Sequence, residues 1–536
     1  MISSKKTRKR GNTMKKLLAL MLCCVMLCGC TANPLLDLYG ITPFEEMEYT
    51  RPDMDAVAKS CQDAIAAAEQ SDDVDEILDA VWGYYDVYDD FTTNYDLAYI
   101  HYHANLGDIY WKAEHDFCAE NAAQLDMYLE DLYYALAECP LRAGLEEEYF
   151  GEGFCLDYEG EGFYDENLVA LMEREQALVS EYYDMTDEAE EEYYSEEYFD
   201  AWAVPMADVL AELIDVRQEI ADYAGFGSYT DFAWDYYYYR DYTPAQASAY
   251  LEEIRTALVP LYESMNAMDV WAPGDEACSE KEVFQYVKTA AKSMGGITEE
   301  AFQRMELGGL CDISASPDKS GMSFELFLSW YYEPYVFVSG TGTGYDKLTF
   351  AHEFGHFAND YAAGGSWAGT DVMEIFSQGM EYMSLCYADA DQDFIDMKLA
   401  DSLSTYVEQA AYAVFEQEMY GLTGEELTGE NLLDLYGEIC RAYGFESMDW
   451  DPRDLVTIPH FYSNPMYIIS YVVSNDAAMQ LYEMELENPG AGKESFEDNL
   501  TTEESFFLAF LEEAGLESPF DRVEEVRALM AERFGK

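Results

Sequence analysis

Apolar side chains recur at helical spacing along most of the chain. In several segments they fall at positions i, i+3 and i+4, which is the period of an amphipathic helix. The clearest of these segments are Val74–Asp89, Ala122–Ala137, Glu166–Tyr183, Met206–Ala224 and Pro244–Leu261. Strand-like runs are few, and the clearest is Phe327–Ser339, in which Tyr335–Val338 is aromatic and β-branched. The pattern therefore predicts a mainly helical protein with a small amount of sheet.

The length of the chain predicts more than one folded lobe. Its 536 residues exceed what a single core ordinarily accommodates. No internal repeat or long linker marks a division, so we place a soft boundary near residue 200, after an acidic run. We expect an N-terminal helical lobe over residues 46–200 and a second lobe, which carries the chemistry, over residues 201–536.

The N-terminus has the organisation of a secretory signal. Two lysines precede an apolar run over residues 17–27, which is too short to cross a bilayer. The run ends in Leu27-Cys28-Gly29-Cys30, which resembles a bacterial lipobox. That resemblance implies a lipoprotein signal peptide over residues 1–29, lipid modification of Cys30 and a short tether over residues 30–45. We therefore expect an extracytoplasmic protein that a lipid anchors to the bacterial cell membrane; a plain secretory signal with incidental cysteines is the alternative.

The charge balance excludes one class of partner. Seven of the 29 basic residues lie before Cys30 and none of the 108 acidic residues does, so the expected mature chain has a formal charge of −86. Such a chain repels nucleic acid and anionic lipid headgroups, and contact with a membrane should therefore depend on the lipid anchor. The same field favours cationic peptides, although that argument rests on charge alone.

The segment His352-Glu353-Phe354-Gly355-His356 carries the strongest chemical signal. In a helix His352 and His356 lie on one face, and two imidazoles so placed can share one Zn²⁺. Glu353 then lies beside the metal as a base toward water. The chain has only six histidines, so chance would produce this motif in about one such chain in a hundred. Three other histidines, His101, His103 and His115, do not share one face of a helix. We therefore expect no second metal site there.

A zinc hydrolase needs a third protein ligand, and the next predicted helix offers one. The motif helix should run from about Tyr345 to Gly364-Gly365, where the glycines favour a helix end. Thr370 and Asp371 are good N-cap residues for the following helix, which carries Glu374. In so acidic a chain, spacing alone leaves Glu374 as one candidate among others.

Four blocks resemble the thimet oligopeptidase/oligoendopeptidase F family, in its oligoendopeptidase F-like branch. They are Lys319–Met322 leading into Pro334–Phe337, Thr349–His356, Asp371–Gln378, and Ile458–Tyr462 with Tyr467 and Tyr471. The first block resembles the edge strand of the family and the approach to it, and the last resembles its downstream His/Tyr block. Weaker similarities at residues 217–229 and 510–515 extend the resemblance over about residues 200–520.

The resemblance implies a mainly α, two-lobed zinc metalloendopeptidase. A deep substrate channel would admit short peptides and exclude folded proteins, with a small β-sheet beside the active site. One Zn²⁺ per chain would be held by His352, His356 and Glu374, and Glu353 would pass a proton from water to the leaving amine. An extended peptide could pair with the strand at residues 334–337.

The resemblance also implies donors for the oxyanion that forms during peptide hydrolysis. His460 and either Tyr467 or Tyr471 would have this role, and the two tyrosines, one helical turn apart, could both face the zinc. The residues that would hold the histidines and the helices in place are Asp371, Gln378 and Glu381.

Two features depart from the family pattern. The gap from His356 to Glu374 is 18 residues, shorter than the family leads us to expect, and Asn359 stands where many members have a histidine. The short gap puts the connection between the two helices in question. One alternative is a peptide-binding lipoprotein with little catalysis, which Glu353 argues against because a binder needs no base. Another is a zinc carboxypeptidase of a related HExxH helical fold, which its products would distinguish.

Overall fold

The computed structural model describes residues 40–151, 153–158, 165–188, 196–366 and 368–535, together with Leu36. The predicted signal peptide and Cys30 lie outside these residues, as does most of the predicted tether. Within them the chain is mainly helical with one three-stranded sheet, as the hydrophobic pattern predicts. None of the described helices is both long and apolar enough to span a membrane.

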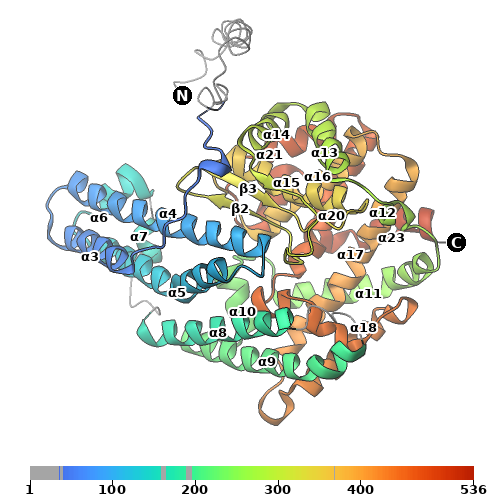
Figure 1. Ribbon diagram of the computed structural model, residues 1–536, viewed down its shortest axis with the longest axis horizontal. Coiled ribbons are helices and arrows are strands. Elements are labelled where there is room, and N and C mark those ends of the chain that lie inside the picture. The colour runs from blue at the N-terminus through green and yellow to red at the C-terminus, as the bar shows by residue number, and fades with distance from the viewer. Residues whose placement is uncertain are drawn as a thin grey trace, which may run out of the picture.

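The N-terminal helices form a bundle with a core of its own (Figure 1, blue). Its helices are α3 (Met54–Gln70), α4 (Val74–Ala104) and α5 (Ile109–Glu138), followed by the short α6 (Arg142–Leu145) and α7 (Phe154–Asp157). Aspartates begin the three long helices, since the carboxylates of Asp53, Asp73 and Asp108 accept hydrogen bonds from backbone N–H groups of the first turn. Val57 of α3, Val81 of α4 and Leu132 of α5 are among the side chains buried between them.

A second and larger core joins the remaining elements. Its long helices are α8 (Glu166–Glu188), α9 (Glu196–Tyr223), α11 (Pro244–Asn266), α13 (Glu280–Met294), α14 (Gly296–Gly308), α15 (Asp346–Ala363), α16 (Thr370–Tyr387), α17 (Gln392–Met419), α18 (Gly429–Ala442) and α20 (Ile469–Glu487). The shorter ones are α10 (Tyr229–Phe232), α12 (Ala272–Asp275), α19 (His460–Ser463), α21 (Ala491–Asn499), α22 (Phe507–Ala514) and α23 (Val523–Phe534). Each predicted helical segment lies within α4, α5, α8, α9 or α11, except that Ala224 falls one residue beyond α9.

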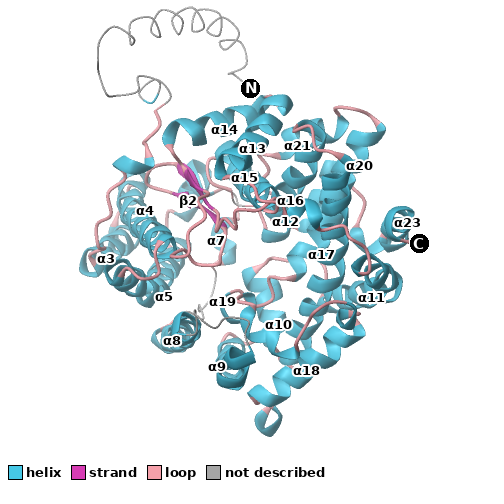
Figure 2. Cartoon of the chain, turned by 45° about the vertical axis from the view of Figure 1, so that its right-hand side comes forward, coloured by secondary structure: helices cyan, strands magenta, loops and turns pink. Residues whose placement is uncertain are grey.

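The sheet has the order β1-β3-β2. It lies beside α15 (Figure 2, magenta). β1 (Cys311–Asp312) runs parallel to β3 (Glu333–Phe337), and β2 (Phe324–Leu328) pairs with β3 in antiparallel register, Phe324 opposite Phe337. The single strand predicted over Phe327–Ser339 is wrong, because a turn closed by Tyr332 at φ 56° divides it into parts of two strands. Trp330 and Tyr332 of that turn are aromatic, as strand residues often are, but they are exposed to solvent.

The strand at residues 334–337 is therefore not an edge strand. β3 is central and buried along its length, whereas β2 is an outer strand of the sheet. A peptide that extends the sheet would pair with an outer strand, because β3 already has a partner on each side. The predicted strand does lie beside α15, the helix that carries the two motif histidines, but it is the central strand of the sheet and not an edge strand.

α15 and α16 form the helix pair that the two motifs predict. α15 ends at Gly364, which adopts the left-handed conformation (φ 79°) that favours glycine. α16 begins at Thr370, but its N-cap is Gly369, so the prediction that Thr370 or Asp371 caps the helix is wrong. Asp371 is buried against other side chains instead. The short connection after His356 closes without difficulty, and α16 packs between α15 and α20.

Candidate metal centre and active site

His352, His356 and Glu374 converge on one point. One ligand atom from each lies within 4.8 Å of the other two, and among the described residues this is the one group of three or more possible metal ligands. The Nε2 atoms of His352 and His356 lie 3.4 and 3.7 Å from Oε2 of Glu374. Two imidazole nitrogens and a carboxylate oxygen are a donor set that zinc uses in catalytic sites, where a fourth position stays open. The residues present therefore fit a bound Zn²⁺.

Glu374 is held in place from two sides. The hydroxyl of Ser377 donates to its Oε2 at 2.6 Å, and the hydroxyl of Tyr467 donates to its Oε1 at 2.5 Å. Burial alone would raise the pKa of Glu374, but the two histidines and these hydrogen bonds outweigh it and lower the pKa. The side chain is thus kept as the carboxylate that a metal cation requires.

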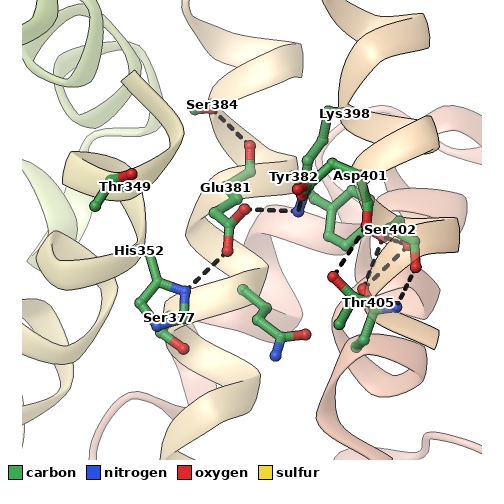
Figure 3. A network of polar contacts seen from close by, with 12 residues as sticks. Thr349, His352, Ser377, Glu381, Tyr382, Ser384, Lys398, Asp401, Ser402 and Thr405 are labelled. Atoms are coloured by element: carbon green, nitrogen blue, oxygen red, sulfur yellow. Dashed lines mark hydrogen bonds and ion pairs between the residues drawn. The ribbon is translucent and has the colours of Figure 1, made fainter. Parts of the chain in front are cut away.

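Glu381 fixes the orientation of His352 (Figure 3). Nδ1 of His352 donates to Oε1 of Glu381 at 2.9 Å, which leaves Nε2 directed at Glu374. The other oxygen of Glu381 lies 2.6 Å from Nζ of Lys398, which also binds Asp401 at 2.8 Å. Burial would raise the pKa of Glu381, but Lys398 and His352 hold it below its usual value.

Glu353, next to His352 on α15, is almost fully buried. Burial raises its pKa to about 7; the charge of His352 opposes this shift, and the neighbouring carboxylates Glu374 and Glu381 add to it. A carboxyl group with a pKa near neutrality can both accept and release a proton at working pH, which is what a general base followed by a general acid must do.

The structure brings His460, Tyr467 and Tyr471 to the same place. The ring of Tyr467 lies 5.2 Å from that of Tyr471 and 5.8 Å from that of His460, between ring centres. Nε2 of His460 lies 3.2 Å from the hydroxyl of Tyr471. Burial raises the pKa of Tyr471 well above 10, so its hydroxyl stays protonated as a donor. The two tyrosines differ, because only the Tyr467 hydroxyl donates to Glu374 in the described part of the chain.

Asp371 and Gln378 join helices rather than orient the histidines. The carboxylate of Asp371 lies 3.3 Å from Nε of Arg240 and accepts from the Ser470 hydroxyl at 2.5 Å. Nε2 of Gln378 donates to the carbonyl of Tyr471 at 3.2 Å. Both residues thereby tie α16, which carries Glu374, to α20. Of the three predicted supporting residues, only Glu381 contacts a histidine in the described chain.

The loop that carries Tyr467 has supports that the sequence did not indicate. The Tyr238 hydroxyl donates to the carbonyl of Pro465 at 2.8 Å, and Glu416 accepts from the backbone N–H of Met466 at 2.7 Å. Met466 has φ 65°, a conformation that costs a side-chain-bearing residue energy unless its surroundings enforce it. Tyr238 and Glu416 therefore hold a strained turn that presents Tyr467 to Glu374.

One sequence signal could have indicated the ion pair between Lys398 and Glu381. Basic residues are scarce in the chain, and Lys398 of α17 is buried. A buried cation must be paired, so a basic residue at a core position of a predicted helix indicates a carboxylate partner. No comparable signal exists for Tyr238, since the chain has 46 tyrosines.

The remaining histidines, His101, His103 and His115, belong to the N-terminal helices α4 and α5. His101 stacks on Trp111 at 4.1 Å between ring centres. His103 and His115 lie 6.2 Å apart between ring centres, from α4 and α5. Within the described residues, they do not belong to a group of three possible metal ligands.

Comparisons with known proteins agree with this fold. Residues 44–157 match the Peptidase M3 N-terminal domain. The chain is similar to a solved structure assigned as an oligoendopeptidase F, with 20% identity, a TM-score of 0.81 and coverage of 92% of this chain and 99% of that one. It is also similar to PZ peptidase A solved with an inhibitor, with 19% identity, a TM-score of 0.79 and coverage of 91% and 99%.

A third similar structure is assigned as an oligoendopeptidase F from Bacillus anthracis str. Ames, with 20% identity, a TM-score of 0.77 and coverage of 92% and 98%. No curated protein matches the chain. The matches to solved structures extend over nearly the full length of those proteins, so both lobes of the fold are shared.

Proposed function

We propose that the chain is an oligoendopeptidase F-like member of the peptidase M3 family and a zinc-dependent endopeptidase of short peptides. The match of residues 44–157 to the Peptidase M3 N-terminal domain and the similarity of the fold to oligoendopeptidase F structures support the proposal. The observation that carries the proposal is the convergence of His352, His356 and Glu374, with Glu353 on the same helix as the two histidines. Three protein ligands leave a position for water, which a structural zinc site with four ligands does not.

The reaction divides among few side chains. Zn²⁺ held by His352, His356 and Glu374 would supply the Lewis acidity that activates water and polarises the peptide carbonyl. Glu353 takes the proton of the attacking water and delivers it to the leaving amine, and its pKa of about 7 suits both transfers. Glu381 supports this arrangement, because it fixes the ring of His352 through Nδ1.

Tyr471 and His460 are the donors that we assign to the oxyanion. The hydroxyl of Tyr467 already donates to Glu374, so we assign Tyr467 to holding that ligand. Tyr471→Phe should lower kcat about 10²- to 10³-fold with little change in KM, as for loss of one oxyanion donor. Tyr467→Phe should weaken metal binding as well, and equal metal affinities in the two variants would contradict this division of roles.

We also propose that the protein is a bacterial lipoprotein outside the cytoplasm, supported by the lipobox-like Leu27–Cys30. Metabolic labelling with a radioactive fatty acid should mark the wild-type protein and not Cys30→Ala. A labelled Cys30→Ala protein would contradict the assignment.

The test of the activity uses quenched fluorescent peptides of increasing length. Wild type should cleave short peptides internally, lose activity to a chelator and regain it with Zn²⁺. Glu353→Gln should bind metal but cleave at least about 10²-fold more slowly. The matched control is Glu485→Gln, which changes a buried glutamate of α20 that binds Tyr387 and a backbone N–H outside the site.

Mass spectrometry of the products separates the alternatives. Internal fragments support an endopeptidase, whereas stepwise loss of C-terminal residues would indicate a carboxypeptidase. Peptide binding without turnover would indicate a binding protein. Cleavage that resists the chelator, or full activity in Glu353→Gln, would refute the zinc mechanism.

A further inference from the structure

We propose that a cavity beside Tyr467 is a subsite for a positively charged group of the peptide substrate. The inference deepens the proposed peptidase function and rests on it. The cavity has a volume of about 620 Å³ and lies between α4, α5, α8 and the segment 463–467. Its lining reaches Tyr467, whose hydroxyl contacts Glu374. A peptide bound at the metal centre can therefore extend into it.

The walls of the cavity are rich in tyrosine. Those contributed by α4, α8 and the residues that precede α11 are Tyr95, Tyr99, Tyr102, Tyr183, Tyr229, Tyr237 and Tyr238. An aromatic face attracts a cation through its quadrupole, and the attraction grows when the cation is partly removed from water. The chain already uses this contact at the wall of the cavity, since the guanidinium of Arg240 lies 4.3 Å from the ring centre of Tyr238.

The acids of the cavity outnumber its cations. The acidic residues that line it are Asp116, Glu120, Asp126, Glu173 and Glu175, and the one lysine or arginine is Lys112. Lys112 is committed, because its Nζ lies 2.8 Å from Asp184, and Glu175 is neutralised by Arg217 at 2.6 Å. Asp126, Glu120 and Glu173 have no ion-pair partner within the described residues. The cavity therefore attracts cations and disfavours anions.

His103 supplies an independent observation that points to a ligand for the cavity. It lines the cavity, is only 4% exposed, and its Nδ1 has no hydrogen-bond partner within the described chain. A buried polar atom without a partner costs free energy, which a ligand that donates a hydrogen bond would recover. Burial lowers the pKa of His103 to about 3, so its ring is neutral at neutral pH and does not offset the acids. Lysine and arginine side chains and a peptide α-ammonium group all offer such donors.

The experiment moves one lysine along an otherwise neutral peptide of fixed length. At one position, lysine should lower KM about tenfold relative to its uncharged isostere norleucine, with kcat nearly unchanged, and added salt should reduce the preference. A second series compares free and acetylated N-termini. If acetylation of the N-terminus weakens binding and norleucine substitution does not, the subsite holds the α-ammonium group. If norleucine substitution weakens binding and acetylation does not, the subsite holds the lysine side chain.

Two double variants locate the effect. Asp126→Asn with Glu173→Gln removes two cavity acids of α5 and α8, and should abolish the lysine preference while leaving cleavage of the norleucine peptide unchanged. The control, Asp131→Asn with Glu181→Gln, removes the same charge from exposed positions of the same helices that do not line the cavity. It should retain the preference. Equal loss in both variants would mean that the overall field is responsible, and this would overturn the proposal.

A binding arm separates this proposal from the proposed activity. Fluorescence anisotropy of labelled peptides on the Glu353→Gln protein should show the same preference in Kd as wild type shows in KM. If no peptide is cleaved by wild type with Zn²⁺ but the lysine peptide binds more tightly, the activity fails and the subsite stands. If cleavage is normal and no position distinguishes lysine from norleucine, the subsite fails and the activity stands.

Discussion

Gly355→Ala should separate the two helices that carry the metal ligands. Gly355 lies on α15 against the backbone of α16. A Cβ atom at this position would lie 2.3 Å from the carbonyl oxygen of Phe376 and 2.6 Å from Cα of Ser377. Both are backbone atoms of α16, which cannot turn aside as a side chain can. To reach ordinary van der Waals distances the helices must move apart by about 1 Å.

Two effects of opposite sign decide the outcome for stability. Alanine favours a helix interior over glycine by about 1 kcal/mol. Overpacking a well-filled interface costs about 1–3 kcal/mol, and contact with a backbone belongs at the upper end of that range. We expect a net loss of about 1–2 kcal/mol. The larger effect is on the metal, because zinc sites tolerate only a few tenths of an ångström in ligand distance, and a shift of about 1 Å moves Glu374 away from the histidines of α15.

The assay combines denaturant unfolding of the metal-free protein with Zn²⁺ titration against a competing chelator. Gly355→Ala should lose at least about tenfold in metal affinity. The matched control is Gly379→Ala on α16, where the added Cβ meets the side chains of Leu481 and Phe496 at 3.3 Å. Side chains can adjust by that amount, so the control should keep wild-type stability and metal affinity. A Gly355→Ala protein that binds Zn²⁺ as tightly as wild type would refute the reasoning.

Three other substitutions test separate contacts. Glu381→Gln should weaken Zn²⁺ affinity about 10- to 100-fold, measured by chelator competition, because His352 loses its ionised partner; equal affinity would contradict the role of Glu381. Arg304→Met should cost about 3–5 kcal/mol in urea unfolding, because the buried Glu333 loses its cation; a loss below about 1 kcal/mol would contradict this. Burial raises the pKa of Glu416 from 4.5 to about 8, so the folded state keeps a proton that the unfolded state has released, and the free energy of unfolding should fall as pH rises between these values. In Glu416→Gln, the difference in the free energy of unfolding between pH 5 and pH 8 should be smaller by about 2–4 kcal/mol than in wild type. The same pH dependence in both proteins would contradict the raised pKa of Glu416.

The convergence of His352, His356 and Glu374 was predictable in part from local rules. The two histidines lie on one helix at a spacing that the period of the helix fixes, and Gly364 ends that helix where the sequence indicates. Spacing left Glu374 as one candidate among the acids of the next helix, and the family resemblance singled it out. The helix positions also followed from hydrophobic period, because long amphipathic segments have few alternative structures.

The supporting contacts were not predictable, because they join residues far apart in sequence. Arg240 reaches Asp371 from another segment, and nothing near either residue indicates the pairing. The prediction that Thr370 or Asp371 caps α16 was wrong for the same reason. The tertiary contacts that bury Asp371 outweigh its local preference for the N-cap position. The hairpin between β2 and β3 was read as one strand because its turn residues are aromatic, and only the pairing register distinguishes turn from strand.

The charge imbalance of the chain links the core to the cavity. The basic residues that the fold buries are Arg217, Arg240, Lys319, Lys398 and Arg522, and each lies within ion-pair distance of a carboxylate. These pairs hold helices together and orient the ligands. The chain has few basic residues, and those in buried pairs are not available to pair with acids at the surface or in the cavity. Three acids of the cavity, Glu120, Asp126 and Glu173, have no ion-pair partner within the described residues. A positively charged group of the substrate would then pair with these acids in the cavity. The same acidic composition that disfavours nucleic acid as a partner would therefore favour peptides that carry a positive charge.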